Sequence, residues 1–345
     1  ANTTGNYNVG IGKGAVGKNT TASNNVGVGY AALGETTTGG ANTAVGMRAL
    51  AEVTTASDNT SIGHDAGRNI TTGTRNVAVG GYALDANTTA SNNTAMGYNA
   101  LGANTTGASN VGIGYQALLA NTTADGNVAI GSGALVANTT GAGNVGIGLD
   151  CMAANTTGYR NVAIGKDCFA TNTTGNENVA IGQSALELAT TADANVGIGY
   201  NSLSKITTGA ENTVVGQSAM ENITTGSSNV AVGRMALRNS TANSNTAVGH
   251  QSMYNNTTGA ENTALGKNSL DSNTTASQNT AVGYDALQAD TTGESNTAVG
   301  AYTLDALTTA NNNTAMGKNA GGLITTGNQN TMLGQNSGDR LVTGA

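Results

Sequence analysis

The stretch Asn279–Ser295, NTAVGYDALQADTTGES, is followed at once by Asn296–Asn312, NTAVGAYTLDALTTANN, which repeats the same pattern. If the opening Asn of each stretch is called place 0, it recurs in twenty copies, 17 residues apart except for one 16-residue step from Asn229 to Asn245. A fixed period of this kind is the signature of a repeat architecture. We therefore expect a single repeat domain over residues 1–345. Place 0 falls at Asn8, Asn25, Asn42, Asn59, Asn76, Asn93, Asn110, Asn127, Asn144, Asn161, Asn178, Asn195, Asn212, Asn229, Asn245, Asn262, Asn279, Asn296, Asn313 and Asn330.

The columns of this repeat carry the structural information. Place 1 is always Val or Thr, place 3 is always Val, Ile, Leu or Met, and place 4 is Gly in every copy. Place 2 is mostly Gly or Ala, place 7 is small, and place 8 is mostly Leu. Alternating β-branched and tiny residues predict a short strand over places 0 to 4. The sequence NTT followed by Gly or Ala, at places 11 to 14, predicts a second short strand that ends in a tight turn.

The charged residues test this assignment independently. Of 33 charged residues, 32 fall at places 5, 6, 9, 10, 15 and 16, and only Asp290 lies elsewhere, at place 11. Charges avoid positions where burial is costly, so these six places predict three solvated corners in each coil.

Because a 17-residue coil cannot bury its own apolar face, we expect identical coils to stack into an all-β, parallel β-solenoid (a β-roll) of about twenty coils. Stacking aligns place 0 into an Asn ladder that bonds from coil to coil. It also aligns place 4 into a Gly column, which marks a bend or a close backbone approach. The predicted ladder includes Asn110, Asn127, Asn144, Asn161 and Asn178, and the predicted column includes Gly114, Gly131, Gly148, Gly165 and Gly182.

Composition narrows the classes of function. The chain has 51 Gly, no Pro, no Trp, one Phe and 10% charged residues, so a thick core is out of reach. Its net charge is −7 and its thirteen Lys and Arg are dispersed, whereas nucleic-acid binding needs clustered cations. No apolar run approaches the ~18 to 20 residues of a membrane span. We expect neither a nucleic-acid partner nor membrane insertion within this segment.

Places 1, 2, 3, 7 and 8 form more than one apolar stripe. One stripe can fill the coil, and a second is then left for a partner. Side-by-side association of identical copies buries such a stripe symmetrically, and we favour a homotrimer. Neither end carries an atypical capping repeat, which favours a section of a longer fibre.

The pentapeptides NVAIG (Asn127–Gly131, Asn161–Gly165, Asn178–Gly182), NTAVG and NVGIG resemble the NSVAIG-type motif of trimeric autotransporter adhesin heads, the YadA-like β-roll. Similar Asn-Thr-Ala-rich repeats occur in bacteriophage tail fibres. The resemblance covers the whole chain through a five-residue motif, and the period of 17 is longer than is usual in the adhesin heads. It implies a trimeric fibre on a virion or a bacterial surface, in an extracellular location, with a cell-surface receptor or glycan as partner.

The sequence contains no pattern of residues typical of a catalytic site. The two histidines, His64 and His250, both occupy place 5 and lie eleven coils apart, so they cannot share a site. No grouping of nucleophile, base and orienting residue occurs. We expect no enzyme, no cofactor and no metal site. The tyrosines at place 5 are interpreted as half-exposed corner residues, although they could also stack on sugars.

Cys151 and Cys168 both occupy place 7, in adjacent coils. Their separation permits a disulfide, but side chains in a stack point the same way, which makes the required dihedral awkward. We interpret them as two small buried thiols.

The Thr pairs at places 12 and 13, such as Thr105–Thr106, give ranks of Thr along the stack. Ice-binding solenoids present such arrays, although adjacent residues of a strand point in opposite directions, which would leave one outer rank. The sequence therefore favours a structural fibre or adhesin shaft, with an ice-binding β-solenoid as the alternative.

Overall fold

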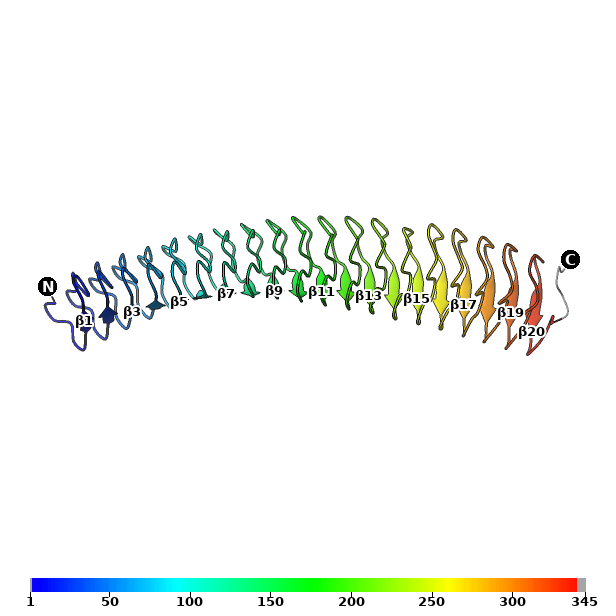
Figure 1. The fold of residues 1–345 in the computed structure, drawn as a ribbon, viewed down its shortest axis with the longest axis horizontal. Helices are drawn as coiled ribbons and strands as arrows, with labels where there is room; N and C mark the ends of the chain where they lie inside the picture. The colour runs from blue at the N-terminus through cyan, green and yellow to red at the C-terminus, as the bar shows by residue number, and fades with distance from the viewer. Residues whose placement is uncertain (1, 340–345) are drawn as a thin grey trace. The chain divides into compact units, whose positions relative to one another are not determined.

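The structure is a computed structural model that describes residues 2–339. It divides into two compact units, one ending at Asn176 and one beginning at Glu177. Each unit contains ten strands of three residues, one per coil, and Figure 1 shows consecutive strands lying side by side. No helix occurs between residues 2 and 339.

The first unit contains β1 (Val9–Ile11), β2 (Val26–Val28), β3 (Thr43–Val45), β4 (Thr60–Ile62), β5 (Val77–Val79), β6 (Thr94–Met96), β7 (Val111–Ile113), β8 (Val128–Ile130), β9 (Val145–Ile147) and β10 (Val162–Ile164). The second unit contains β11 (Val179–Ile181), β12 (Val196–Ile198), β13 (Thr213–Val215), β14 (Val230–Val232), β15 (Thr246–Val248), β16 (Thr263–Leu265), β17 (Thr280–Val282), β18 (Thr297–Val299), β19 (Thr314–Met316) and β20 (Thr331–Leu333).

Within each unit, every strand except the last pairs in parallel with that of the next coil, and equivalent places face each other. Val111 is paired with Val128 in the first unit, and Thr280 is paired with Thr297 in the second. The predicted fold class, a parallel β-solenoid of 17-residue coils, is confirmed in both units. The register follows from the repeat, because equal spacing brings each column onto itself.

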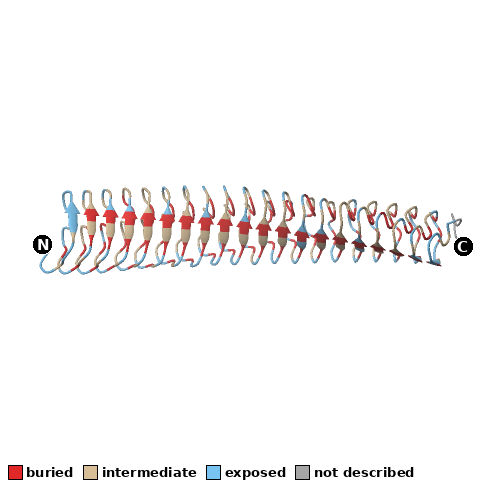
Figure 2. Cartoon of the chain, turned by 90° about the horizontal axis from the view of Figure 1, so that it is seen from below, coloured by how far each residue is buried: buried red, intermediate tan, exposed pale blue. Residues whose placement is uncertain are grey.

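Places 0, 2, 7, 8, 11 and 14 point into the coil, and Figure 2 shows buried residues recurring at matching positions of successive coils. In the coil that opens at Asn110, Gly112, Ala117 and Leu118 are buried, whereas Val111 and Ile113 on the strand are not. This coil thus buries one large side chain, at place 8, among small ones. Some coils also bury a large residue at place 11, as the coil from Asn195 does with Leu203 and Ile206. The strand turns places 1 and 3 outward and place 2 inward.

The prediction of a second strand at places 11 to 14 is wrong. The Thr pair forms two bends, and its backbone groups bond to the next coil without strand geometry. The N–H groups of Thr105 and Thr106 both donate to the carbonyl oxygen of Thr122, at 2.9 and 3.2 Å. One acceptor shared by two consecutive donors forces the chain to curve, which a ladder of alternating bonds would not do.

Three further places hold non-glycine residues in left-handed backbone conformations. Within one stretch these are Ser109 at place 16, Gln116 at place 6 and Leu118 at place 8, with φ of 59°, 55° and 53°. A left-handed L-residue costs roughly 1–2 kcal/mol, so the neighbouring coils must hold it in place. The N–H of Leu118 donates to the carbonyl of Ala134 at 3.0 Å, and that of Gln116 donates to Tyr98 at 3.0 Å. Coil-to-coil bonds thus fix the corners as well as the strands.

The 16-residue step is accommodated at an exposed position. The coil from Asn229 lacks the place-13 residue, which is an exposed Thr in the other coils, for example Thr106 and Thr275. Its remaining Thr241 still donates from its backbone N–H to Thr257, at 2.7 Å. Asn229 likewise still donates to the carbonyl of Ala242, at 2.9 Å. The missing residue is therefore an exposed one, and every buried place of the coil is still occupied.

Candidate functional site

The place-0 asparagines are buried and link each coil to the next. The Asn110 carboxamide oxygen accepts the backbone N–H of Asn127 at 2.9 Å, and Asn127 accepts that of Asn144 at 2.9 Å. The carboxamide nitrogen of Asn127 donates instead to the carbonyl of Gly141, at 2.9 Å, within its own coil. The coil-to-coil bond common to these residues therefore joins a side chain to the backbone. In part of the column the amides also bond to one another: the carboxamide nitrogen of Asn161 donates to the carboxamide oxygen of Asn144 at 3.2 Å. Asn178 follows the same pattern in the second unit, where it accepts from Asn195 at 2.9 Å.

A second Asn column, at place 11, was missed by the sequence reasoning. Here the amides do bond to one another along the stack. The amide nitrogens of Asn121, Asn138 and Asn155 donate to the oxygen of the preceding Asn at 2.8, 3.1 and 2.8 Å. All three side chains are fully buried. The signal was present, since Asn precedes the Thr pair in nine of the twenty copies, but it was assigned to a strand.

The place-4 glycines show both an unusual backbone angle and a close approach. Gly114, Gly131, Gly148 and Gly165 have φ between 135° and 141°, and Gly182 has 129°. A Cβ built on Gly182 would lie 2.6 Å from the carbonyl oxygen of Gly199. Only glycine combines that φ with that separation, so the column is a requirement of the backbone.

The two cysteines are fully buried and remain thiols. The Cys151 sulfur donates to the carbonyl of Ala163 at 3.2 Å. A hydrogen bond with Cys168, together with burial, raises the pKa of the Cys151 thiol far above its usual range. Such a thiol is a poor nucleophile and a poor metal ligand, because both roles need the thiolate.

The outward face of the strands is an apolar strip, defined here as places 1 and 3. Place 3 is aliphatic in every coil, and its side chains include many of the most exposed large apolar groups of the protein. Exposed fractions are 42% for Met96, 37% for Ile130 and Ile164, and 47% for Leu265. Place 1, Val or Thr, lies beside it and is mostly half-buried. Each unit therefore carries an exposed row of aliphatic side chains at place 3, beside which place 1 is Val in half of the coils and Thr in the other half.

The Thr ranks differ between their two places. At place 12 the hydroxyl donates to the carbonyl of the next coil, as for Thr105 to Thr122 at 3.0 Å and Thr139 to Thr156 at 3.0 Å. At place 13 the Thr is exposed, as at Thr106. The Thr hydroxyl groups at place 13 therefore form a single outward-facing rank along the stack.

Four aromatic rings form a file at the place 5 and 6 corner of the first unit. His64 and Tyr82 lie 5.1 Å apart between ring centroids, Tyr82 and Tyr98 lie 5.8 Å apart, and Tyr98 and Tyr115 lie 5.9 Å apart. The sequence interpretation considered only the tyrosines at place 5, whereas Tyr82, at place 6, joins this file. The Asp65 carboxylate lies 2.6 Å from Arg48 and 3.6 Å from His64. The other histidine, His250, lies beside Arg234.

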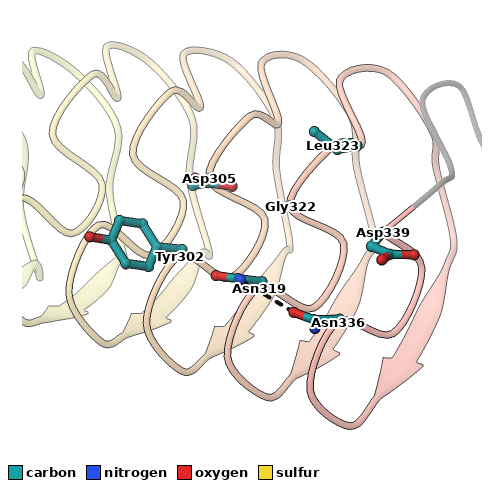
Figure 3. Close-up of a pocket in the computed structure, with 7 residues that line it drawn as sticks. All are labelled: Tyr302, Asp305, Asn319, Gly322, Leu323, Asn336 and Asp339. Atoms are coloured by element: carbon teal, nitrogen blue, oxygen red, sulfur yellow. Dashed lines mark hydrogen bonds between the residues drawn. The ribbon is translucent and has the colours of Figure 1, made fainter.

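A groove of about 560 Å³ crosses the last three described coils (Figure 3). One wall is the place-6 column, Tyr302, Asn319 and Asn336, and the other is the place-9 column, Asp305, Gly322 and Asp339, with Leu323 at its rim. Asn319 donates to the carboxamide oxygen of Asn336 at 3.2 Å. Burial raises the pKa of Asp305 above its usual range, and the backbone N–H groups at 305 and 306 oppose this.

Across residues 2–339, no three His, Cys, Asp or Glu side chains come together in an arrangement that could hold a metal ion. No stretch of those residues forms a helix long and apolar enough to cross a membrane. No protein-family model matches the chain, and no curated protein matches it either.

Proposed function

We propose that this chain is a structural segment of a fibre, an adhesin shaft or phage tail fibre in an extracellular location, in which identical copies associate side by side as a homotrimer. The observation that carries the proposal is the apolar strip. Monomeric proteins rarely expose a long contiguous apolar surface, and such a strip typically marks an interface. Here the strip repeats with the coil, so any partner that covers it must repeat in the same way.

A second copy of the same chain has a surface that repeats with the same spacing. Copies related by rotation about an axis parallel to the stack present equivalent places at the same height, so Ile or Val at place 3 meets its own equivalent. Burying one aliphatic side chain is worth about 1.5–3 kcal/mol, and the strip offers one in each coil. Association would supply the burial that thin coils, with only one or two large buried side chains each, lack.

The mechanism is mechanical. Parallel backbone bonds, the two Asn columns and the place-8 side chains resist bending and separation of neighbouring coils. Catalysis has no part in this proposal. The corners at places 5, 6, 9, 10, 15 and 16 tolerate varied side chains, so they can carry recognition without disturbing the stack.

Solution mass by light scattering tests the assembly. A mass three times that of the 33.8 kDa chain is the expected result. The double variant Ile130→Lys/Ile164→Lys places two charges on the strip and should yield monomers, because a buried unpaired charge is strongly unfavourable. Leu149→Lys is the matched control: Leu149 is 44% exposed in the intervening coil, but at place 5, outside the strip. A monomeric parent chain, or equal effects of both changes, would refute the proposal.

Ice binding by the Thr ranks is the second candidate, supported by the regular exposure of place 13. The place-12 hydroxyls already donate to carbonyl groups, which leaves a single outward rank rather than a paired one. Thermal hysteresis measured on the full chain is its assay.

A further inference from the structure

We propose that the groove between Tyr302 and Asp339 is a binding site for an uncharged saccharide. The inference deepens the proposed function, on which it rests, because it names the chemical class that one corner of the fibre would recognise. The lining residues offer two carboxylates, two carboxamides, one tyrosine ring and one leucine rim. Its volume of about 560 Å³ lies within the range of small-molecule sites.

The groove exists because a side chain is missing at place 9. Gly322 lies between Asp305 and Asp339 in that column, whereas other coils carry large residues there, such as Leu119 and Gln288. A Cβ built on Gly322 would meet the Asp305 carboxylate oxygen at 3.2 Å and no other side chain among its nearest contacts. The carboxylate therefore borders the space that a larger residue at Gly322 would fill.

A glycine at place 9 is not sufficient by itself. Gly102 occupies the same place in the first unit, but there the Asn99 carboxamide of the same coil lies directly over it. In the groove the equivalent residue, Asn319, is instead hydrogen-bonded to Asn336 of the next coil. The two carboxamides form one wall, and the floor beside Gly322 stays open.

The polar lining matches a polyhydroxylated ligand. Each sugar hydroxyl both donates and accepts a hydrogen bond; carboxylates accept, and carboxamides do both. Both walls of the groove therefore present oxygen atoms that can accept hydrogen bonds from the hydroxyl groups of a sugar. The lining contains two acidic residues and no basic one, so sialic acids, uronates and phosphorylated sugars would be repelled.

The tyrosine extends the site along the stack. In Figure 3 the Tyr302 ring runs away from the open groove, toward the preceding coil. There it meets the Tyr284 ring edge to face, with centroids 5.2 Å apart. One sugar residue held among Asp305, Asn319 and Asn336 would leave the next residue of a saccharide beside these rings, whose faces pack well against C–H groups.

Saturation-transfer NMR on the full chain tests the proposal, with lactose, maltose, cellobiose and N,N′-diacetylchitobiose as neutral probes and sialyllactose as the anionic probe. We expect saturation of the ring protons of at least one neutral disaccharide. Gly322→Gln should weaken binding at least tenfold by filling the groove, and Gln288 shows that place 9 accepts this side chain. Gly102→Gln, the same change at the same place in the first unit, is the matched control and should leave binding unchanged.

Tyr302→Ala should weaken disaccharide binding while leaving the solution mass unchanged. No transfer to any neutral disaccharide overturns the proposal. Equal transfer in the Gly322→Gln variant, or stronger transfer to sialyllactose, also overturns it. A homotrimer that binds none of the probes refutes only the groove site, whereas a monomer that binds a neutral disaccharide refutes only the fibre assembly.

Discussion

Asp290 is the one charged residue outside the corner places, and it occupies the place-11 Asn column. Its side chain is fully buried; one oxygen accepts the N–H of Gly293 at 2.9 Å, and the other has no partner. In the preceding coil Asn273 uses its amide nitrogen at the equivalent position, donating to Ala276 at 3.1 Å and to Asn256 at 3.1 Å. The unpartnered oxygen of Asp290 therefore occupies the position of the Asn amide nitrogen, where the surrounding groups accept hydrogen bonds rather than donate them.

An ionised carboxyl is costly in that position. Burial raises the pKa of Asp290 from 3.8 to about 7, while the backbone N–H groups of Gly293 and Thr291 oppose the rise. Burial and these two backbone N–H groups set the pKa of Asp290, and neither N–H group titrates. The unfolded chain releases the proton near pH 4 and the folded chain near pH 7, so stability is full below pH 4 and is lost as pH rises to 7. A rise of about three pKa units corresponds to roughly 4 kcal/mol.

Asp290→Asn restores the donor and removes the titration. We expect the variant to be more stable than the parent by up to about 4 kcal/mol above pH 7, with the difference shrinking toward pH 4. Urea unfolding followed by circular dichroism at pH 4, 5.5, 7 and 8.5 measures it. Glu294→Gln, which removes one charge from an exposed corner of the same coil, controls for net charge. A difference that is constant across this pH range would refute the reasoning.

Two further substitutions test the stack. Gly63→Ala should lower the free energy of unfolding by more than about 3 kcal/mol, because φ is 140° and the new Cβ would lie 2.6 Å from the Gly80 carbonyl oxygen. Gly81→Ala, whose Cβ would have its nearest contact at 3.5 Å, should be nearly neutral, and similar losses in the two variants would contradict the role of the column. Asn127→Ala should cost about 1–3 kcal/mol in chemical unfolding, since it leaves the N–H of Asn144 without a partner and removes one of the two amide donors to the Gly141 carbonyl, which keeps Asn138. A loss below about 1 kcal/mol would show that the Asn column contributes little.

The sequence by itself determined the repeat and the parallel register. These follow from periodicity, because identical coils can satisfy backbone hydrogen bonds and bury place 8 only by stacking in register. The distribution of charges, with Asp290 as the exception, located the solvated corners before any coordinates were needed. The Gly column was also readable, since no other residue type occurs at place 4 in any copy.

Only the tertiary structure decided which hydrogen bonds hold the coils together and where the surface is hollow. The shared acceptor at Thr122 makes places 12 and 13 a bend, although Thr favours strands, because contacts with the next coil override local propensity. Whether a place-0 Asn bonds only to backbone groups or also to the Asn of the neighbouring coil, as Asn161 does to Asn144, is not revealed by the repeat. The groove likewise depends on Asn319 turning toward Asn336 rather than over Gly322, a choice set by packing between coils and invisible in either coil alone.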